Sequence, residues 1–189
     1  DPASISGDIS GTGEEDGSAI TGTISATDVE GLTDQTYFTV TGEASKGTAS
    51  IDVETGVWTY TPNTNANGAD QFTVTVTDDL GGTTEKVVGL TIAVVDDPAT
   101  ISGDTSGIGD EDAGAITGTI NAVDSADGLT DKTYFTVTSE ASKGTASIDA
   151  ETGVWSYTPN ANANGADQFT VTVTDDLGGT TEQVVGITV

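Results

Sequence analysis

The chain has 189 residues, of which 31 are Asp or Glu and 4 are Lys or Arg, so its net charge at pH 7 is −27. Nucleic acid and anionic membrane surfaces are therefore not expected as partners, because binding to phosphate groups requires Lys and Arg. The lack of Cys, His and Met excludes disulfides, thiolate nucleophiles, His bases and most zinc or copper sites.

The sequence contains two near-copies of one unit. Asp1–Asp8 recurs as Asp97–Asp104, and after one inserted residue near Asp127 the segment Leu32–Ile92 recurs as Leu129–Val189. A period of about one hundred residues is the size of a whole small domain. We therefore predict domains at residues 1–96 and 97–189, with a linker at about 94–98. Because the pattern is cut at both ends, we expect a segment of a longer protein.

Short alternating segments predict only β-strands in each copy. In Gln71–Thr77, Phe72, Val74 and Val76 alternate with Thr residues. This period of two, with Thr on the wet side, is typical of antiparallel strands that bury one face. In order, the strands predicted in the first copy are 3–7, 19–26, 37–41, 47–51, 57–61, 71–77 and 84–95.

Seven short strands per copy, joined by turns rich in Asp, Asn, Gly and Pro, predict an all-β chain with two tandem seven-stranded sandwiches of the Ig-like type. Trp58 alternates with Tyr60 along a strand, and Trp155 alternates with Tyr157. We therefore predict that these rings lie in the core.

Antiparallel order also predicts where the acidic loops lie. Counting strands alternately down and up puts one group at the far end of the first domain, namely Glu14, Glu15, Asp16, Asp70, Asp96 and Asp97. The same count puts a second group at the near end of the second domain, namely Asp124, Asp127, Asp175 and Asp176. If the domains follow each other end to end, the two groups face each other across the linker.

Facing carboxylates need a cation. Two like charges at about 4 Å repel by roughly 1 kcal/mol in water, and by more when they are partly buried. Ca²⁺ takes about 6–8 oxygen ligands and favours carboxylates, so we expect calcium ions to fill this joint and to fix the angle between the domains.

Other interpretations fit parts of the sequence. The acidic loops can simply be solvated, as in halophilic proteins. A carbohydrate- or protein-binding β-sandwich is an alternative function, and exposed Trp58 or Trp155 rings would support it. A hydrolase with a carboxylate pair is a third, although the chain has no His, no Cys and no long loop to form a cleft.

Motifs between the strands resemble those of a known family. The first copy contains Tyr60-Thr61-Pro62-Asn63, Asn67-Gly68-Ala69-Asp70-Gln71-Phe72-Thr73-Val74 and Thr77-Asp78-Asp79-Leu80-Gly81-Gly82, and the second repeats them from Tyr157 to Gly179. Together they are similar to the cadherin-like VCBS repeats of large bacterial RTX adhesins. The resemblance covers nearly the whole chain, and it implies extracellular Greek-key β-sandwiches in tandem with calcium between them.

The resemblance also implies which residues bind calcium. Around the linker these are Glu15, Asp16, Asp70, Asp96, Asp97, Asp124, Asp127 and Asp175. At equivalent positions elsewhere they are Asp28, Glu30, Asp78, Glu111, Asp112 and Asp167. Two departures from the family pattern matter: Asp97-Pro98 lacks the residue often found between Asp and Pro, and the insertion at Asp127 leaves open which acid of that loop is the ligand.

The implied function is structural. The chain would be a calcium-rigidified extender of a secreted bacterial cell-surface adhesin, projecting a distal binding module for cell adhesion and biofilm formation. We expect no catalytic residues and no cofactor besides Ca²⁺. The expected partners are neighbouring repeats of the same chain, with no nucleic acid, no membrane insertion and no distal ligand on this segment, which we expect to be monomeric.

Overall fold

The computed structural model describes residues 1–29, 31–33 and 37–189. The chain divides into two compact units, unit 1 at Asp1–Val95 and unit 2 at Asp96–Val189. Glu30, one of the predicted ligands, lies outside the described residues. Within the described ranges, no helix has the length and apolar character that a membrane span requires.

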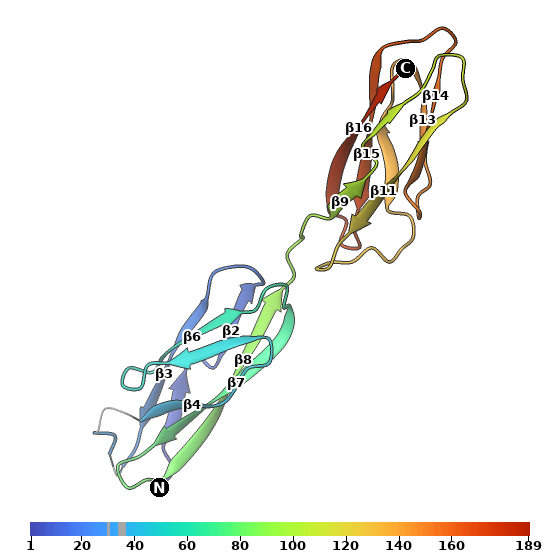
Figure 1. Cartoon of the computed structure of the whole chain (residues 1–189). Coiled ribbons are helices and arrows are strands. Elements are labelled where there is room, and N and C mark those ends of the chain that lie inside the picture. Colours follow the sequence, from blue (N-terminus) through green and yellow to red (C-terminus); the bar gives the residue numbers. More distant parts are fainter. Residues whose placement is uncertain (30, 34–36) are drawn as a thin grey trace. The chain divides into compact units, whose positions relative to one another are not determined.

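Unit 1 is a sandwich of two four-stranded sheets, with the orders β1-β3-β6-β5 and β2-β8-β7-β4 (Figure 1). Its strands are β1 (Ser4–Gly7), β2 (Ser10–Glu14), β3 (Ile20–Thr27), β4 (Phe38–Gly42), β5 (Gly47–Ile51), β6 (Val57–Pro62), β7 (Gly68–Thr77) and β8 (Thr83–Ala93). The inward residues of both sheets form one apolar cluster, as the alternating pattern predicts.

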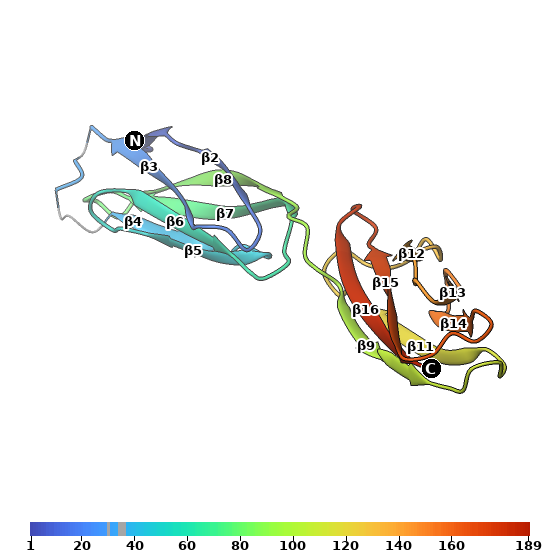
Figure 2. The same ribbon diagram turned by 90° about the horizontal axis from the view of Figure 1, so that it is seen from above.

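Unit 2 repeats this arrangement, with the sheet orders β9-β11-β14-β13 and β10-β16-β15-β12 (Figure 2). Its strands are β9 (Thr100–Gly103), β10 (Ser106–Ile108), β11 (Ile116–Val123), β12 (Phe135–Ser139), β13 (Gly144–Ile148), β14 (Val154–Pro159), β15 (Ala166–Thr174) and β16 (Thr180–Thr188).

The first strand of each unit changes sheets, so the structure has eight strands per unit among the described residues where seven were predicted. In unit 1, β1 pairs antiparallel with β3, whereas β2 pairs parallel with β8. Gly7 makes the crossing at φ +103°, and a Cβ there would lie 2.4 Å from the Thr23 carbonyl oxygen, so only glycine fits. Asp8 fixes the crossing: its amide donates to Thr23 O at 2.8 Å, and its Oδ2 accepts from Thr23 N at 2.9 Å.

The core of unit 1 is centred on Trp58. Its side chain is fully buried and meets the Phe72 ring edge to face, with a centroid distance of 5.6 Å. Trp155 is equally buried and meets Phe169 in the same way. The prediction that both Trp residues lie in the core is confirmed, so neither ring forms the exposed platform on which a sugar-binding function would depend.

Candidate metal centre

Three carboxylates meet at the start of unit 2. Asp96, Asp127 and Asp175 each place an oxygen within 4.8 Å of the others. They come from three segments: the start of the unit, the loop between β11 and β12, and the turn between β15 and β16. Asp96 is exposed, Asp127 is half-buried and Asp175 is only 6% exposed. Within the described residues, no second group of three such side chains approaches as closely.

The turn between β15 and β16 positions Asp175. Its Oδ1 accepts hydrogen bonds from the amides of Leu177 and Gly179, both at 2.9 Å. This is the local hydrogen bonding that makes Asp a turn residue, and it leaves Oδ2 as the atom to offer a metal. Gly179 makes room for Asp96, because a Cβ at position 179 would lie 2.0 Å from Asp96 Oδ1.

The loop between β11 and β12 adds a fourth acid. Asp124 Oδ1 accepts from the amides of Ala126 at 3.0 Å and Asp127 at 2.9 Å. Asp127 Oδ2 in turn accepts from the amide of Asp97 at 2.6 Å. The other oxygen of Asp124, Oδ2, is buried and has no hydrogen-bond partner among the described residues. A buried carboxylate oxygen without a donor is costly, and a bound cation would satisfy it.

The electrostatics of the cluster also favour a bound cation. The pKa of Asp96 is raised above its ordinary value by desolvation and by the negative charges of Asp175, Asp127 and Asp124. Because Asp96 is exposed overall, the neighbouring negative charges together contribute more to this rise than burial does. The cluster consists only of oxygen donors and carries excess negative charge, so it fits a hard divalent cation such as Ca²⁺.

Asp176, the neighbour of Asp175, anchors the loop that carries Asp127. Its carboxylate accepts from Thr130 N at 2.9 Å and Thr130 Oγ1 at 2.7 Å, and its amide donates to Gly128 O at 3.1 Å. The hydrogen bonds from Thr130 lower the pKa of Asp176. Asp176 therefore shapes the site and is not one of its three convergent acids.

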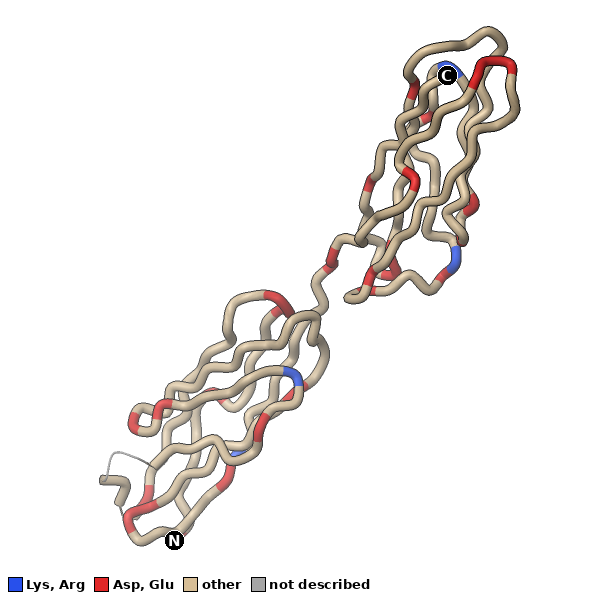
Figure 3. The backbone as a smooth tube through the Cα atoms, in the orientation of Figure 1, with Lys and Arg blue, Asp and Glu red and all other residues tan. Residues whose placement is uncertain are grey.

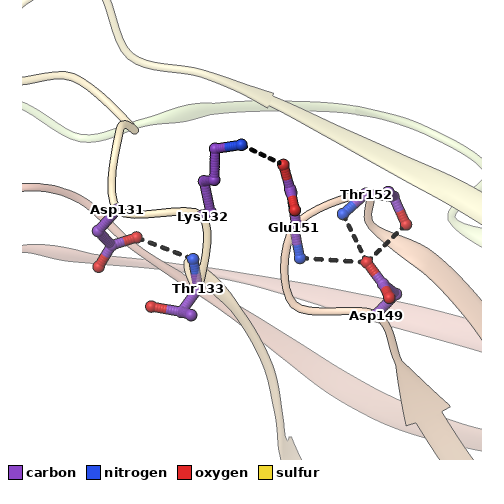
Figure 4. A network of polar contacts seen from close by, with 6 residues as sticks. All are labelled: Asp131, Lys132, Thr133, Asp149, Glu151 and Thr152. Atoms are coloured by element: carbon purple, nitrogen blue, oxygen red, sulfur yellow. Dashed lines mark hydrogen bonds and ion pairs between the residues drawn. The ribbon is translucent and has the colours of Figure 1, made fainter.

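A second anchor of this loop is exposed. Lys132 Nζ lies 3.2 Å from Glu151 Oε1, in the turn between β13 and β14 (Figure 4). That turn is itself held by Asp149 Oδ1, which accepts from the amides of Glu151 and Thr152 at 3.2 and 2.8 Å. An ion pair this exposed contributes about 0–1 kcal/mol, so Asp176 is the stronger anchor.

The predicted acids at the far end of unit 1 also have defined partners. Glu15 is only 2% exposed. Its Oε1 accepts from the amide of Val95 at 3.0 Å, and both its oxygens accept from Asn67 Nδ2, at 3.2 and 2.9 Å. Asp16 Oδ1 accepts from Asn65 N at 3.4 Å. Glu15 therefore ties β2, the loop before β7 and the end of unit 1 together.

Glu111 and Asp112 are the equivalent acids of unit 2 and are held more loosely. Glu111 is exposed and accepts from Asn164 Nδ2 at 3.4 Å, and Asp112 Oδ1 accepts from Asn162 N at 3.3 Å.

Asp70 is already saturated with hydrogen bonds. Oδ1 accepts from Ser45 N and Oγ at 3.0 and 2.8 Å, and Oδ2 accepts from Lys46 N and Tyr60 Oη, both at 2.8 Å. A carboxylate has about four acceptor sites, so a metal at Asp70 would have to displace a protein donor. Burial alone would raise the pKa of Asp70, but these hydrogen bonds outweigh it and hold the pKa well below its ordinary value.

Asp167 repeats this network with Ser142, Lys143 and Tyr157. Burial and the hydrogen bond to Asp167 raise the pKa of Tyr157 to about 12. The geometry favours a structural role for Asp70 and Asp167, and calcium binding by them stays a prediction. Nothing in the strand pattern signalled this role, because the donors lie in other strands and turns.

At the other end of unit 1, Asp28 and Asp78 occupy the positions equivalent to Asp124 and Asp175. Asp78 is 7% exposed, and its Oδ1 accepts from Leu80 N at 2.9 Å and Gly82 N at 2.7 Å. The turn geometry of the candidate centre is therefore repeated here. Figure 3 shows how acidic residues outnumber Lys along both units.

One family model and several solved structures match nearly the whole chain. The family model of the bacterial cadherin-like domain matches residues 1–94 and 96–189. A solved structure of human CDH23 EC21-23 is similar over 95% of this chain and 71% of its own, with a TM-score of 0.58 and 16% identity. The predicted fold of two tandem cadherin-like sandwiches is thus confirmed.

Two protocadherin structures are similar as well. The extracellular cadherin domains 3–6 of protocadherin Gamma B2 match over 98% of this chain and 50% of theirs, with a TM-score of 0.51 and 17% identity. The protocadherin GammaB4 extracellular domain matches over 95% and 33%, with a TM-score of 0.50 and 17% identity. At such identities the likeness concerns the fold alone. None of the curated proteins compared with the chain matches it.

Proposed function

Because the chain belongs to the bacterial cadherin-like domain family, we propose that it is a calcium-rigidified extender of a bacterial cell-surface adhesin, of the kind formed by VCBS repeats in RTX adhesins. Cadherin-like domains are extracellular adhesion modules and not enzymes. Tandem copies of one unit add length without adding new chemistry, which suits a spacer that projects a distal module in adhesion and biofilm formation.

The observation that carries the proposal is the cluster of three carboxylates formed by Asp96, Asp127 and Asp175. Three acids converge within 4.8 Å, and a fourth, Asp124, has a buried oxygen without a hydrogen-bond partner. Solvated surface acids, the simplest alternative, have no reason to converge or to bury an unsatisfied oxygen. Calcium would supply the missing charge and the missing contact.

Chain connectivity supports a role in stiffening the linker. Val95 is held by Glu15 of unit 1 through its amide, and the next residue, Asp96, brings its carboxylate to Asp127 and Asp175 of unit 2. A cation bound by Asp96 would thus remove backbone freedom at the point where the units join. We propose Glu15, Asp16 and Asp97 as further ligands of ions at this joint.

The remaining parts of the proposal concern partners and location. The chain would be secreted to the bacterial surface and would contact neighbouring repeats of the same protein, with no nucleic-acid or membrane partner. A ligand of the adhesin would bind a module other than this one.

Calcium titration by calorimetry tests the metal centre. We expect Asp127→Asn and Gly179→Ala to weaken calcium binding roughly tenfold or more. The first variant removes a ligand charge, and the second places a methyl group where the Asp96 carboxylate lies. Two matched controls should keep the affinity: Glu182→Gln removes one exposed acid of unit 2, and Gly186→Ala adds a methyl group into open space.

The proposal fails if the chain binds no calcium at millimolar concentrations. It also fails if Asp127→Asn and Glu182→Gln weaken binding equally, because calcium would then respond to net charge and not to this site.

A further inference from the structure

The chain enters unit 1 at one end and leaves it at the other (Figure 1). Its first strand, β1, pairs antiparallel with β3, and after the crossing at Gly7 the chain continues as β2, which pairs with β8. The last strand of the unit is β8, which ends at Ala93, just before the linker. Tension applied to the two ends of unit 1 therefore reaches β2 from one side and β8 from the other.

The pairing of β2 with β8 is parallel, and this decides how the two strands are loaded. Five residue pairs are in register, from Ser10 with Gly89 to Glu14 with Ala93. Because the strands run in the same direction, pulling on the chain before β2 and on the chain after β8 acts in opposite directions along them. The evenly spaced hydrogen bonds of a parallel pair are then sheared and must break together. In unit 2, β10 pairs with β16 in the same parallel way.

We propose that the β2–β8 ladder is the element of unit 1 that resists tension, and that Glu15 secures its end next to the linker. The inference rests on the proposed function, because a spacer between a cell and a distal binding module is the part of an adhesin through which tension passes. At the end of the ladder away from the linker, the amide of Gly89 donates to Ile9 O at 3.0 Å.

Glu15 extends the ladder beyond its last pair. Its amide donates to Ala93 O at 3.0 Å, and its Oε1 accepts from Val95 N at 3.0 Å. Both carboxylate oxygens also accept from Asn67 Nδ2, which connects Glu15 to the loop before β7. The side chain is only 2% exposed, and hydrogen bonds shielded from water in this way are stronger. Tension that arrives from the linker therefore meets Val95 first, and Glu15 holds its amide.

Gly11 allows β2 to lie close to the core and in register with β8. A Cβ at this position would lie 2.7 Å from Ile20 and 2.9 Å from the ring of Trp58, both of which are buried. Gly89 belongs to the same ladder, but a Cβ there would meet open space. A methyl group at position 11 should therefore displace β2 from β8, whereas a methyl group at position 89 should leave the ladder intact.

Single-molecule force spectroscopy of the whole chain in chelator tests the inference. The sequence contains no Cys, so two engineered Cys residues define the points of attachment. Pro2→Cys with Val94→Cys loads the ladder in shear, and Ile9→Cys with Val87→Cys opens it from one end; all four positions are exposed. Forced unfolding is governed by the unfolding rate, and we expect the force that unfolds unit 1 to be several-fold higher in shear. Equal forces in the two geometries would overturn the inference.

Two matched pairs of variants, pulled in the shear geometry, isolate the parts of the ladder. Gly11→Ala should abolish the high unfolding force, and Gly89→Ala should keep it. Glu15→Gln should lower the force, and Glu14→Gln should not, because Glu14 is the adjacent acid of β2 and is exposed. Equal losses in the two Gln variants would refute the role of Glu15.

The comparison of the two pulling geometries needs no change inside the ladder, so it decides even if Gly11→Ala does not fold. Because all forces are measured in chelator, the result is independent of the calcium titration. A chain that binds calcium but unfolds at equal forces would contradict this inference alone. A chain that resists shear but binds no calcium would contradict the proposed calcium centre alone.

Discussion

Asp175 and Asp176 are neighbours in one turn and perform different tasks. Asp175 joins Asp96 and Asp127 in the candidate metal centre, whereas Asp176 is bound by Thr130. Counting the strands in the sequence could place both residues at the same end of the domain, because strand order and acid positions are visible there. The sequence could not distinguish their roles, because Thr130, which donates hydrogen bonds to Asp176, lies 46 residues away in another loop.

The same limit applies to Asp70. Its position before the apolar part of β7, together with the family resemblance, predicted a calcium ligand. The four donors from Ser45, Lys46 and Tyr60 that fill it are brought there only by the folded sheets. The Trp residues were easier to predict, since alternation along a strand alone decides which face they occupy.

Asp70 should make the stability of unit 1 sensitive to acid. Its folded-state pKa lies below the ordinary value of 3.8, so the carboxylate contributes stability that is present above about pH 4 and is lost as the pH falls below it. We expect Asp70→Asn to lower the free energy of unfolding at pH 7 by about 1–3 kcal/mol, and by less at pH 3. Chemical denaturation at both pH values measures this.

Glu85→Gln is the control for this prediction, because Glu85 is an exposed acid on β8 and its replacement should change little at either pH. A destabilisation by Asp70→Asn that is equally large at pH 3 and pH 7 would show that the ionised carboxylate is not the source of the stability.

At the scale of elements, the division of the first strand into β1 and β2 could not be predicted from the alternation of apolar residues. β2 contains Ser10-Gly11-Thr12-Gly13, with no apolar side chain to mark a buried face. The glycines are required by packing, since a Cβ at Gly11 or Gly13 would lie 2.7 or 2.6 Å from Ile20. Glycine has a low intrinsic propensity for β-strands, so these residues argue against a strand in the sequence. In the structure they let β2 approach the core closely.

The loop between β11 and β12 is the element on which calcium affinity should depend most. Asp176→Asn removes the charge from the anchor that holds Thr130 and leaves the three convergent acids intact. We expect calcium affinity to fall by about tenfold, as for other partners that orient metal ligands. Calorimetric titration of calcium measures the change.

Asp79→Asn is the matched control, because Asp79 makes the same contacts with Thr33 in unit 1, at 2.9 and 2.7 Å. It removes one charge from the chain and should leave the affinity of the unit 2 centre unchanged. Equal losses in the two variants would show that general charge, and not loop anchoring, controls binding.

At the scale of the whole molecule, cation binding at the ends of the units would explain both the net charge of −27 and the repeated unit. A chain this acidic repels itself unless cations bind or screen it. The near-identical copies place acidic residues at corresponding positions near the ends of each unit, so each junction in a longer array would carry a similar set. Calcium would then convert repulsion at the junctions into a fixed connection.

Solution X-ray scattering of the chain in millimolar calcium and in chelator tests this account most directly. The account predicts a longer maximum dimension and a narrower range of conformations with calcium, because an ion held by Asp96, Asp127 and Asp175 restrains the linker. In the Asp127→Asn variant this response should be lost or should require much more calcium. Scattering curves that are the same in calcium and chelator, from a chain shown to be calcium-bound, would contradict it.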